Sequence, residues 1–393
     1  MLGQDLRQRR FCDPRLQQLA TPPPELLGRG GRRHHPVHVQ LLEIEENADR
    51  PDALLLRLPV NRTSSGDLQF VGDGTFEPNT NITVLVTPAG QADQCIFDGY
   101  VLSWHLHLDR TSGASTIDVW AEDASWLMSV SDTVREWTGM TDGEVANEIF
   151  SSYGFAPADG NTDDDSPQHD PDQHSLFQRG TDLQFLRGLA RRNGKLCRVA
   201  CTDTPGDRTG YFVTPAVDGD PAATISLVDP ETWTVDSLEF DWDVMRPTEV
   251  DASQVPLDED SDDSVDGSST SSGLAPLDAR DYPTYAGQAA TLLLTAAADA
   301  PELTLRTAAT LREAGWFVRC RGETTVDRLG TTLRVGSVVT IEGAGSLHSG
   351  NWFVWNVRHQ ITVDMVKLQF ILLRNAMGPA PAGGLPGGLL GGL

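Results

Sequence analysis

The chain has 393 residues, with 56 acidic side chains against 30 basic ones, and its formal net charge at pH 7 is -26. A charge this negative argues against binding to nucleic acid or to anionic membrane surfaces, because both are bound through basic side chains. The length exceeds one ordinary hydrophobic core and predicts two to four domains. No apolar run is long enough to span a membrane, and the N-terminus lacks the apolar core of an export signal.

The first 36 residues carry seven Arg against three acidic side chains and predict a basic, flexible arm. This arm fits either a docking segment for an acidic neighbouring subunit or a frayed terminus. Residues 37–130 then predict a first β-barrel domain, because apolar and polar residues alternate between turns rich in Gly and Asn. Its strands are expected at 37–46, 54–60, 82–86, 95–108 and 115–121.

Residues 131–248 change period and predict a mixed helical insert. Thr141 and Glu144 form a capping box at the start of a helix that Gly154 ends. Thr181 and Gln184 begin a second helix that stops before Gly194, and strands are expected at 195–201 and 210–214.

Two acidic segments interrupt this pattern. Residues 156–174 carry six Asp and no Lys or Arg, which predicts a surface loop. Residues 249–280 predict a disordered acidic linker. Asp258, Asp260 and Asp262 have the spacing of a calcium loop, but no Gly stands at the sixth position and no Glu at the twelfth, which favours a solvated spacer.

The last third predicts a second β-barrel domain over residues 281–377. A helix at 302–314 ends at Gly315, and strands follow at 316–321, 337–342, 352–359 and 365–374. Residues 378–393 contain only Gly, Pro, Leu and Ala and predict a flexible tail. The expected fold class is therefore β-rich α+β, with two similar β-barrel domains and helical inserts.

Catalytic and metal-binding patterns are missing from the sequence. There is no GxSxG elbow, Walker A loop, dinucleotide fingerprint or HExxH motif, and the nine histidines lack metal-ligand spacing. The five cysteines are widely spread, so buried thiols are expected rather than a zinc ribbon or a disulfide framework. Trp233 and Trp242 near Phe240 fit a sheet core, which is favoured, or a sugar-stacking platform. We expect no enzyme, no cofactor and no metal site.

Five segments nevertheless occur in a recognisable order: 96–101, 119–123, 141–154, 178–194 and 333–359. In this order they resemble the phage late control D family, the baseplate hub proteins of contractile phage tails and phage-tail-like contractile injection systems. The hub portion of type VI secretion spike proteins is related to that family. The residues that match its motifs are Phe97, Gly99, Asp123, Gly154, Gln178, Asp182, Phe185, Leu186, Leu189, Gly336, Gly343, Gly345, Gly350, Val354 and His359.

The resemblance implies a homotrimer whose two barrels per subunit form a pseudo-sixfold ring around a channel. Such a ring adapts a threefold spike to a sixfold inner tube, and it has no catalytic residues. The implied partners are a separate spike protein, inner tube or tube-initiator proteins and other baseplate proteins. The implied location is a tail-like particle that is assembled in the cytoplasm and can be released.

Two other functions remain open at this point, a carbohydrate-binding protein and a cell-wall-hydrolysing protein associated with a tail. More than half of the negative charge lies in the two acidic segments, so we interpret it as a property of the surface and not of binding. A negatively lined channel would disfavour the passage of DNA, which favours an injection system with protein cargo.

Overall fold

The computed structural model describes most of the chain between residues 39 and 378. The described ranges are 39–111, 113–155, 162–170, 175–254, 265–283, 289–293, 300–362 and 364–378. The predicted basic arm, nearly all of the predicted tail, and the residues proposed for a calcium loop lie outside the described residues.

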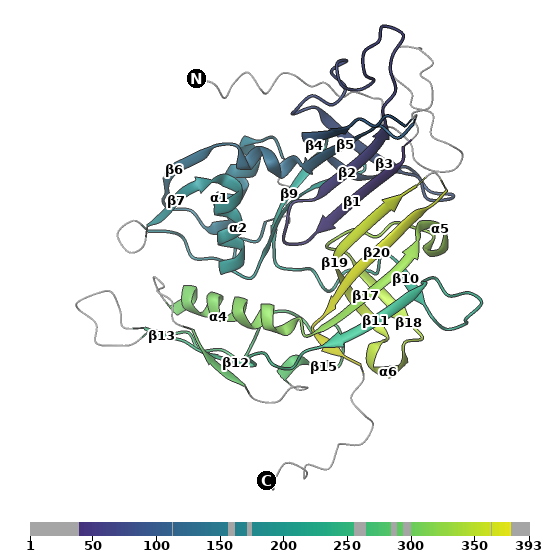
Figure 1. Cartoon of the computed structure of the whole chain (residues 1–393). Coiled ribbons are helices and arrows are strands. Elements are labelled where there is room, and N and C mark those ends of the chain that lie inside the picture. The colour runs from purple at the N-terminus through teal and green to yellow at the C-terminus, as the bar shows by residue number, and fades with distance from the viewer. Residues whose placement is uncertain are drawn as a thin grey trace.

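A first group of five antiparallel strands follows the alternation expected from the sequence (Figure 1). Alternate side chains of β1, β2 and β5 are buried, because one face of the sheet covers the core. The strands lie side by side in the order β1-β2-β5-β4-β3. Their bounds are β1 Leu41–Asn47, β2 Ala53–Pro59, β3 Asn81–Val86, β4 Gln94–His107 and β5 Thr116–Asp123.

A second group of strands repeats this arrangement late in the chain. The order is β11-β17-β20-β19-β18, so its fifth strand also lies beside its second. We call these groups the first and the second β unit. The bounds of the second are β11 Ser237–Trp242, β17 Val318–Thr325, β18 Val338–Glu342, β19 Gly350–Ile361 and β20 Val366–Arg374.

The two β units are joined in one eleven-stranded sheet, with β10 (Thr224–Ser226) parallel to β18. β19 makes the junction, because its first half pairs with β18 and its second half with β1. One hydrophobic core runs through both units. The strand pairing thus joins the two expected domains edge to edge. The strand β11 was not expected from the sequence, and it brings part of the expected insert into the second unit.

The residues that lie between the two units in the sequence form a lobe with its own hydrophobic core. This lobe lies beside β4 and β5 (Figure 1). The helices α1 and α2 match the predicted ones, and Thr141 forms the predicted capping box with Glu144. The paired strands β6 and β7 were not expected from the sequence. The bounds are η1 Ala124–Ser129, β6 Asp132–Trp137, α1 Asp142–Ser152, β7 Leu176–Thr181, α2 Asp182–Arg192, β8 Leu196–Cys201 and β9 Arg208–Val213.

The described part of residues 249–280 is ordered into short strands, which corrects the prediction of a disordered linker there. Short strands pair there, β12 with β16 and β13 with β14, and they pack against α4. β15 pairs with β21 beside them. The bounds are β12 Glu249–Asp251, β13 Ser253–Gln254, β14 Val265–Asp266, β15 Arg280–Asp281, β16 Ala290–Leu292, α4 Ala300–Gly315, α5 Val326–Leu329, α6 Gly345–His348 and β21 Ala376–Met377.

Candidate assembly site

The junction between β1 and β19 contains a fully buried charged group. Glu46 on β1 accepts a hydrogen bond from Arg334 Nε at 2.9 Å and one from His359 Nε2 at 3.1 Å. The Glu46 and His359 side chains have no exposed surface. Although burial alone would raise the pKa of Glu46, the Arg334 guanidinium and His359 lower it to about 2. The ion pair of Glu46 with Arg334 and the hydrogen bond with His359 therefore hold the first β unit against the second.

A second buried carboxyl lies near this junction, and its pKa is raised where that of Glu46 is lowered. Asp123, at the end of β5, caps η1 by accepting a hydrogen bond from Ser125 N at 2.6 Å and also accepts one from Asp52 N. Burial raises the pKa of Asp123 to about 6. Burial and the neighbouring Asp123 also raise the pKa of Asp52. These two carboxyls favour protonation in the folded chain.

Three of the motif residues from the end of the sequence support the same junction. His359 is the buried partner of Glu46, and Gly336 N donates to Val354 O at 3.0 Å. Gly336 has a φ of 88°, and a Cβ there would lie 3.0 Å from the guanidinium of Arg198. The sequence motif therefore corresponds to a turn and a strand that are packed against the lobe.

Two motif residues of β4 are fixed by close packing. Phe97 is fully buried, and a Cβ on Gly99 would lie 2.0 Å from Glu122 O on the neighbouring strand. The sheet therefore allows only glycine at position 99 without a backbone shift.

The glycine motif around 343–350 marks turns, as expected. Gly343, Gly345 and Gly350 all have positive φ, and a Cβ on Gly350 would lie 2.6 Å from Arg374 Nη2. The Arg374 side chain is fully buried, bound to Asp278 and 5.3 Å above the Trp352 ring. This glycine thus leaves space for a buried arginine of the second unit.

The remaining motif residues hold the lobe together. Buried Gln178 accepts a hydrogen bond from Trp137 Nε1 at 3.1 Å and donates one to Asp182. Asp182 also accepts from Tyr153 Oη at 2.6 Å, and burial with this contact raises the pKa of Tyr153. Phe185 stacks on Trp137, Leu186 and Leu189 are buried, and Gly154 ends α1 with a φ of 73°.

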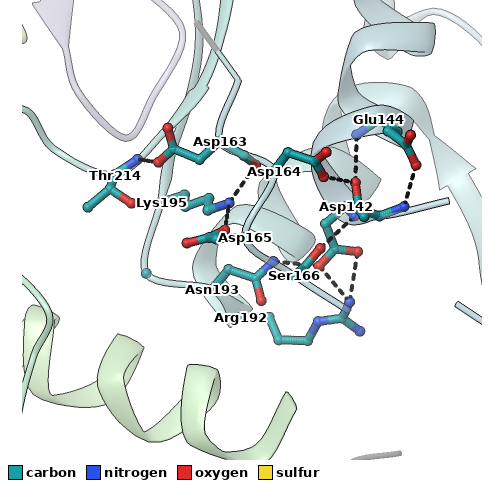
Figure 2. A network of polar contacts seen from close by, with 12 residues as sticks. Asp142, Glu144, Asp163, Asp164, Asp165, Ser166, Arg192, Asn193, Lys195 and Thr214 are labelled. Carbon is teal, nitrogen blue, oxygen red and sulfur yellow. Dashed lines mark hydrogen bonds and ion pairs between the residues drawn. The ribbon is translucent and has the colours of Figure 1, made fainter. Parts of the chain in front are cut away.

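The described part of the first acidic segment, residues 162–170, lies at the surface without helix or strand and is tied to the lobe by a polar network (Figure 2). Asp142, at the start of α1, contacts Arg192 Nη2 at 2.9 Å and His169 Nε2 at 2.7 Å. Although burial would raise the pKa of Asp142, His169 and Arg192 lower it to about 2. Lys195 donates to Asp163 O at 2.8 Å and pairs with Asp165. The aspartates here form internal contacts that their density in the sequence did not reveal.

Two cysteines that are distant in the sequence also lie close together. Cys201 Sγ, at the end of β8, donates to Cys95 O on β4 at 3.2 Å, and Arg334 Nη2 lies 3.5 Å from the same sulfur. Their 106-residue separation carries no motif that could have indicated the contact.

Several aromatic side chains that the sequence offered as core or binding residues are exposed. Trp242 is 53 % exposed and Trp233 39 %, so the favoured interpretation of both as core residues is wrong. Trp104 on β4 is 41 % exposed. Among the described residues, no group of three or more His, Cys, Asp or Glu could hold a metal ion. The described helices are all too short or too polar to cross a membrane.

Comparison with known proteins gives relatives by structure alone. No model of a known protein family matches the chain, and no curated protein matches its sequence. The solved tail protein from Neisseria meningitidis has a TM-score of 0.59 at 14 % identity, covering 88 % of this chain and 94 % of its own. A 43 kDa prophage tail protein from Shewanella oneidensis has a TM-score of 0.53 at 14 % identity, covering 86 % of this chain and 94 % of its own.

A third similar structure comes from a secretion system. It is an Escherichia coli protein described as a component of the type VI secretion system and as structurally similar to bacteriophage T4 tail proteins. Its TM-score is 0.53 at 13 % identity, covering 88 % of this chain and 77 % of its own. The chain therefore has the fold of phage tail and type VI secretion proteins, which confirms at the level of fold the resemblance found in its sequence.

Proposed function

We propose that this chain is the baseplate hub of a contractile phage tail or injection system, in the late control D family. Three copies form a ring that adapts a threefold spike to a sixfold inner tube. The ring binds a separate spike protein on one side and tube or tube-initiator proteins on the other. Other baseplate proteins contact its outside, and it is assembled in the cytoplasm into a particle that can be released.

The observation that carries this proposal is the repeated strand order. Two units with the same five-strand arrangement occur in one chain, so three chains supply six similar units while keeping threefold symmetry. An adaptor between a threefold and a sixfold structure needs six similar units in a threefold arrangement. We propose that the two units form the two barrels of each subunit in such a ring.

A structural role also fits the contacts of the motif residues. The motif residues form hydrogen bonds, turns and packing contacts, such as the Glu46–His359 pair and the Gln178–Asp182 pair. Their side chains are committed to holding the fold, which supports a non-enzymatic function.

The proposal is tested by measuring the mass of the purified chain by light scattering, alone and co-expressed with the spike protein of its particle. We expect an assembly of about three times the 42.7 kDa of one chain, with a ring visible by negative-stain electron microscopy. A monomer under both conditions would contradict the hub function.

A further inference from the structure

We propose that the outer edge of β11 in one copy pairs with residues 103–107 of β4 in a second copy. This contact would repeat between copies the junction that β1 and β19 form within one chain. The inference rests on the proposed ring and names the strands and the register that hold it together.

The registers within the two β units show which residues of β4 and β19 occupy equivalent positions. Both strands contain an irregularity of one extra residue against their neighbour, between Val101 and Ser103 in β4 and between Val354 and Asn356 in β19. Ser103 pairs with Trp120 directly after the first irregularity, and Asn356 pairs with Ile371 after the second. Residues 103–107 of β4 and the following Leu108 therefore correspond to residues 356–361 of β19.

The registers also show which residues of β1 and β11 occupy equivalent positions in the two units. Glu43 lies opposite Leu55, which lies opposite Trp120. Glu239 lies opposite Arg321, which lies opposite Ile371. Because Trp120 and Ile371 are equivalent, Glu239 of β11 corresponds to Glu43 of β1.

Applying the register of the β1–β19 junction to β11 and β4 gives the residue pairs expected between two copies. Within the chain, Glu43 pairs with Gln360, Glu45 with Arg358 and Glu46 with Val357. The equivalent pairs between copies are Glu239 with His107, Asp241 with His105 and Trp242 with Trp104. The two outward pairs each join a carboxylate to an imidazole, and these groups can form hydrogen bonds with each other.

Both strand edges are open in the described part of the chain. No described strand pairs with β11 on the side away from β17. Beyond Val101, whose backbone bonds to Asn79 and Thr80, no described strand pairs with β4 on the side away from β5. Open edges with apolar side chains favour pairing with another chain.

The exposed fractions of the side chains differ between the junction and its equivalent positions. On β19, Val357 is 0 % exposed and Ile361 is 1 % exposed, because β1 covers them. Their equivalents on the first unit are Trp104 and Leu108, which are 41 % and 55 % exposed. Trp242, which would face Trp104, is also half exposed. The residues that stay exposed in a single copy are thus those that the proposed contact would cover.

A contact of this kind joins two different surfaces, so it generates a ring when the rotation closes. Each copy would contribute one internal junction and one junction to its neighbour. First and second β units would then alternate around the ring.

The test is an engineered disulfide between copies. The variant Glu239→Cys with His107→Cys places two thiols opposite each other, and mild oxidation is expected to give covalent dimers and trimers on a non-reducing gel. The matched control, Glu239→Cys with Ser103→Cys, keeps the same face but shifts one thiol by four residues, about 13 Å along the strand. Each single-cysteine variant and the wild type control for the native cysteines.

Light scattering on the same samples separates this inference from the proposed function. Trimers that cross-link in the expected register and not in the control support the pairing. Trimers that fail to cross-link, or that cross-link equally in the control, overturn the pairing and leave the hub function standing. A chain that is monomeric under all conditions overturns both.

A charge exchange gives a second test that needs no oxidation. Asp241→Arg places a cation opposite His105 and is expected to raise the concentration at which trimers dissociate by about tenfold. Adding His105→Asp restores an attractive pair and is expected to recover most of the loss. If Asp241→Arg leaves dissociation unchanged, or if the second change gives no rescue, the proposed register is wrong.

Discussion

β1 and β11 occupy the same place in their β units, but their surroundings differ. β1 lies between β2 and β19, and its inward residues Leu42, Ile44 and Glu46 are buried. β11 pairs with β17 on one side, and its corresponding residue Trp242 is half exposed. Burial of a strand therefore depends on its second neighbour more than on its own alternation. A buried charge is tolerated in β1 because Arg334, in the segment before β18, neutralises it and His359 of β19 adds a hydrogen bond.

The largest effect is expected from breaking the charged group at the intrachain junction. Glu46→Leu leaves His359 and Arg334 without their carboxylate and should lower the free energy of unfolding by about 3–5 kcal/mol. Urea denaturation at low protein concentration measures it. Trp242→Ala at the equivalent position of β11 should change the unfolding of the separate chain by about 0.5 kcal/mol or less. Equal losses from both substitutions would show that the two strands are not as different as their burial indicates.

The next effect is on the pH dependence of stability. The raised pKa of Asp123 means that the folded chain binds a proton more tightly than the unfolded chain does. Its contribution to stability is therefore full below the ordinary pKa near 3.8 and is lost as the pH rises through about 6. A shift of two units corresponds to about 3 kcal/mol.

Denaturation of the wild type and of Asp123→Asn at pH 4 to 7 measures this contribution. The variant should lack the decline over this range. Glu46 and Asp142 act in the opposite direction, because their lowered pKa values add stability that is lost as the pH falls toward 2. A wild-type decline that persists unchanged in Asp123→Asn would assign the titration to another group, and Asp52→Asn would then be the variant to measure.

A smaller effect concerns a close approach in the first unit that the second unit lacks. Gly99→Ala places a Cβ against Glu122 O and should lower the free energy of unfolding by roughly 1–3 kcal/mol. Trp352 fills the equivalent place in β19. The matched control is Gly188→Ala on α2, where no neighbour lies within 4 Å, and it should stabilise the chain by about 0.5–1 kcal/mol. A harmless Gly99→Ala would mean that β4 and β5 can separate without cost.

The smallest effect is expected on the outer face of the sheet. Arg57 and Asp118 form a two-bond ion pair in the first unit, where the second unit has Glu323 and Gln369. Arg57→Ala should cost less than about 1 kcal/mol, because the pair is partly exposed. Thermal melts at low and high salt check this, and a loss that salt does not reduce would point to packing of the arginine stem instead.

Much of the local structure was predictable from the sequence. Alternation gave the strands β1 to β5 and β17 to β20, and the caps at Thr141 and Thr181 gave α1 and α2. The strand β11 was missed although Leu238, Phe240 and Trp242 alternate, because its exposed edge makes the pattern ambiguous. Internal contacts of the acidic segments were also missed. A high density of Asp indicates solvation on average, but it does not reveal that Asp142 or Lys195 supplies an internal partner.

The sequence by itself determined most of the strands of the two β units, the helices α1, α2 and α4, and the order of the motif segments, because caps, turns and alternation act over a few residues. Only the tertiary structure decided that β1 pairs with β19 and that Glu46 meets His359 across 313 residues. These contacts depend on which strand edges remain open after each unit has formed. Such a choice is made by packing and backbone hydrogen bonding over the whole sheet, and no local pattern encodes it.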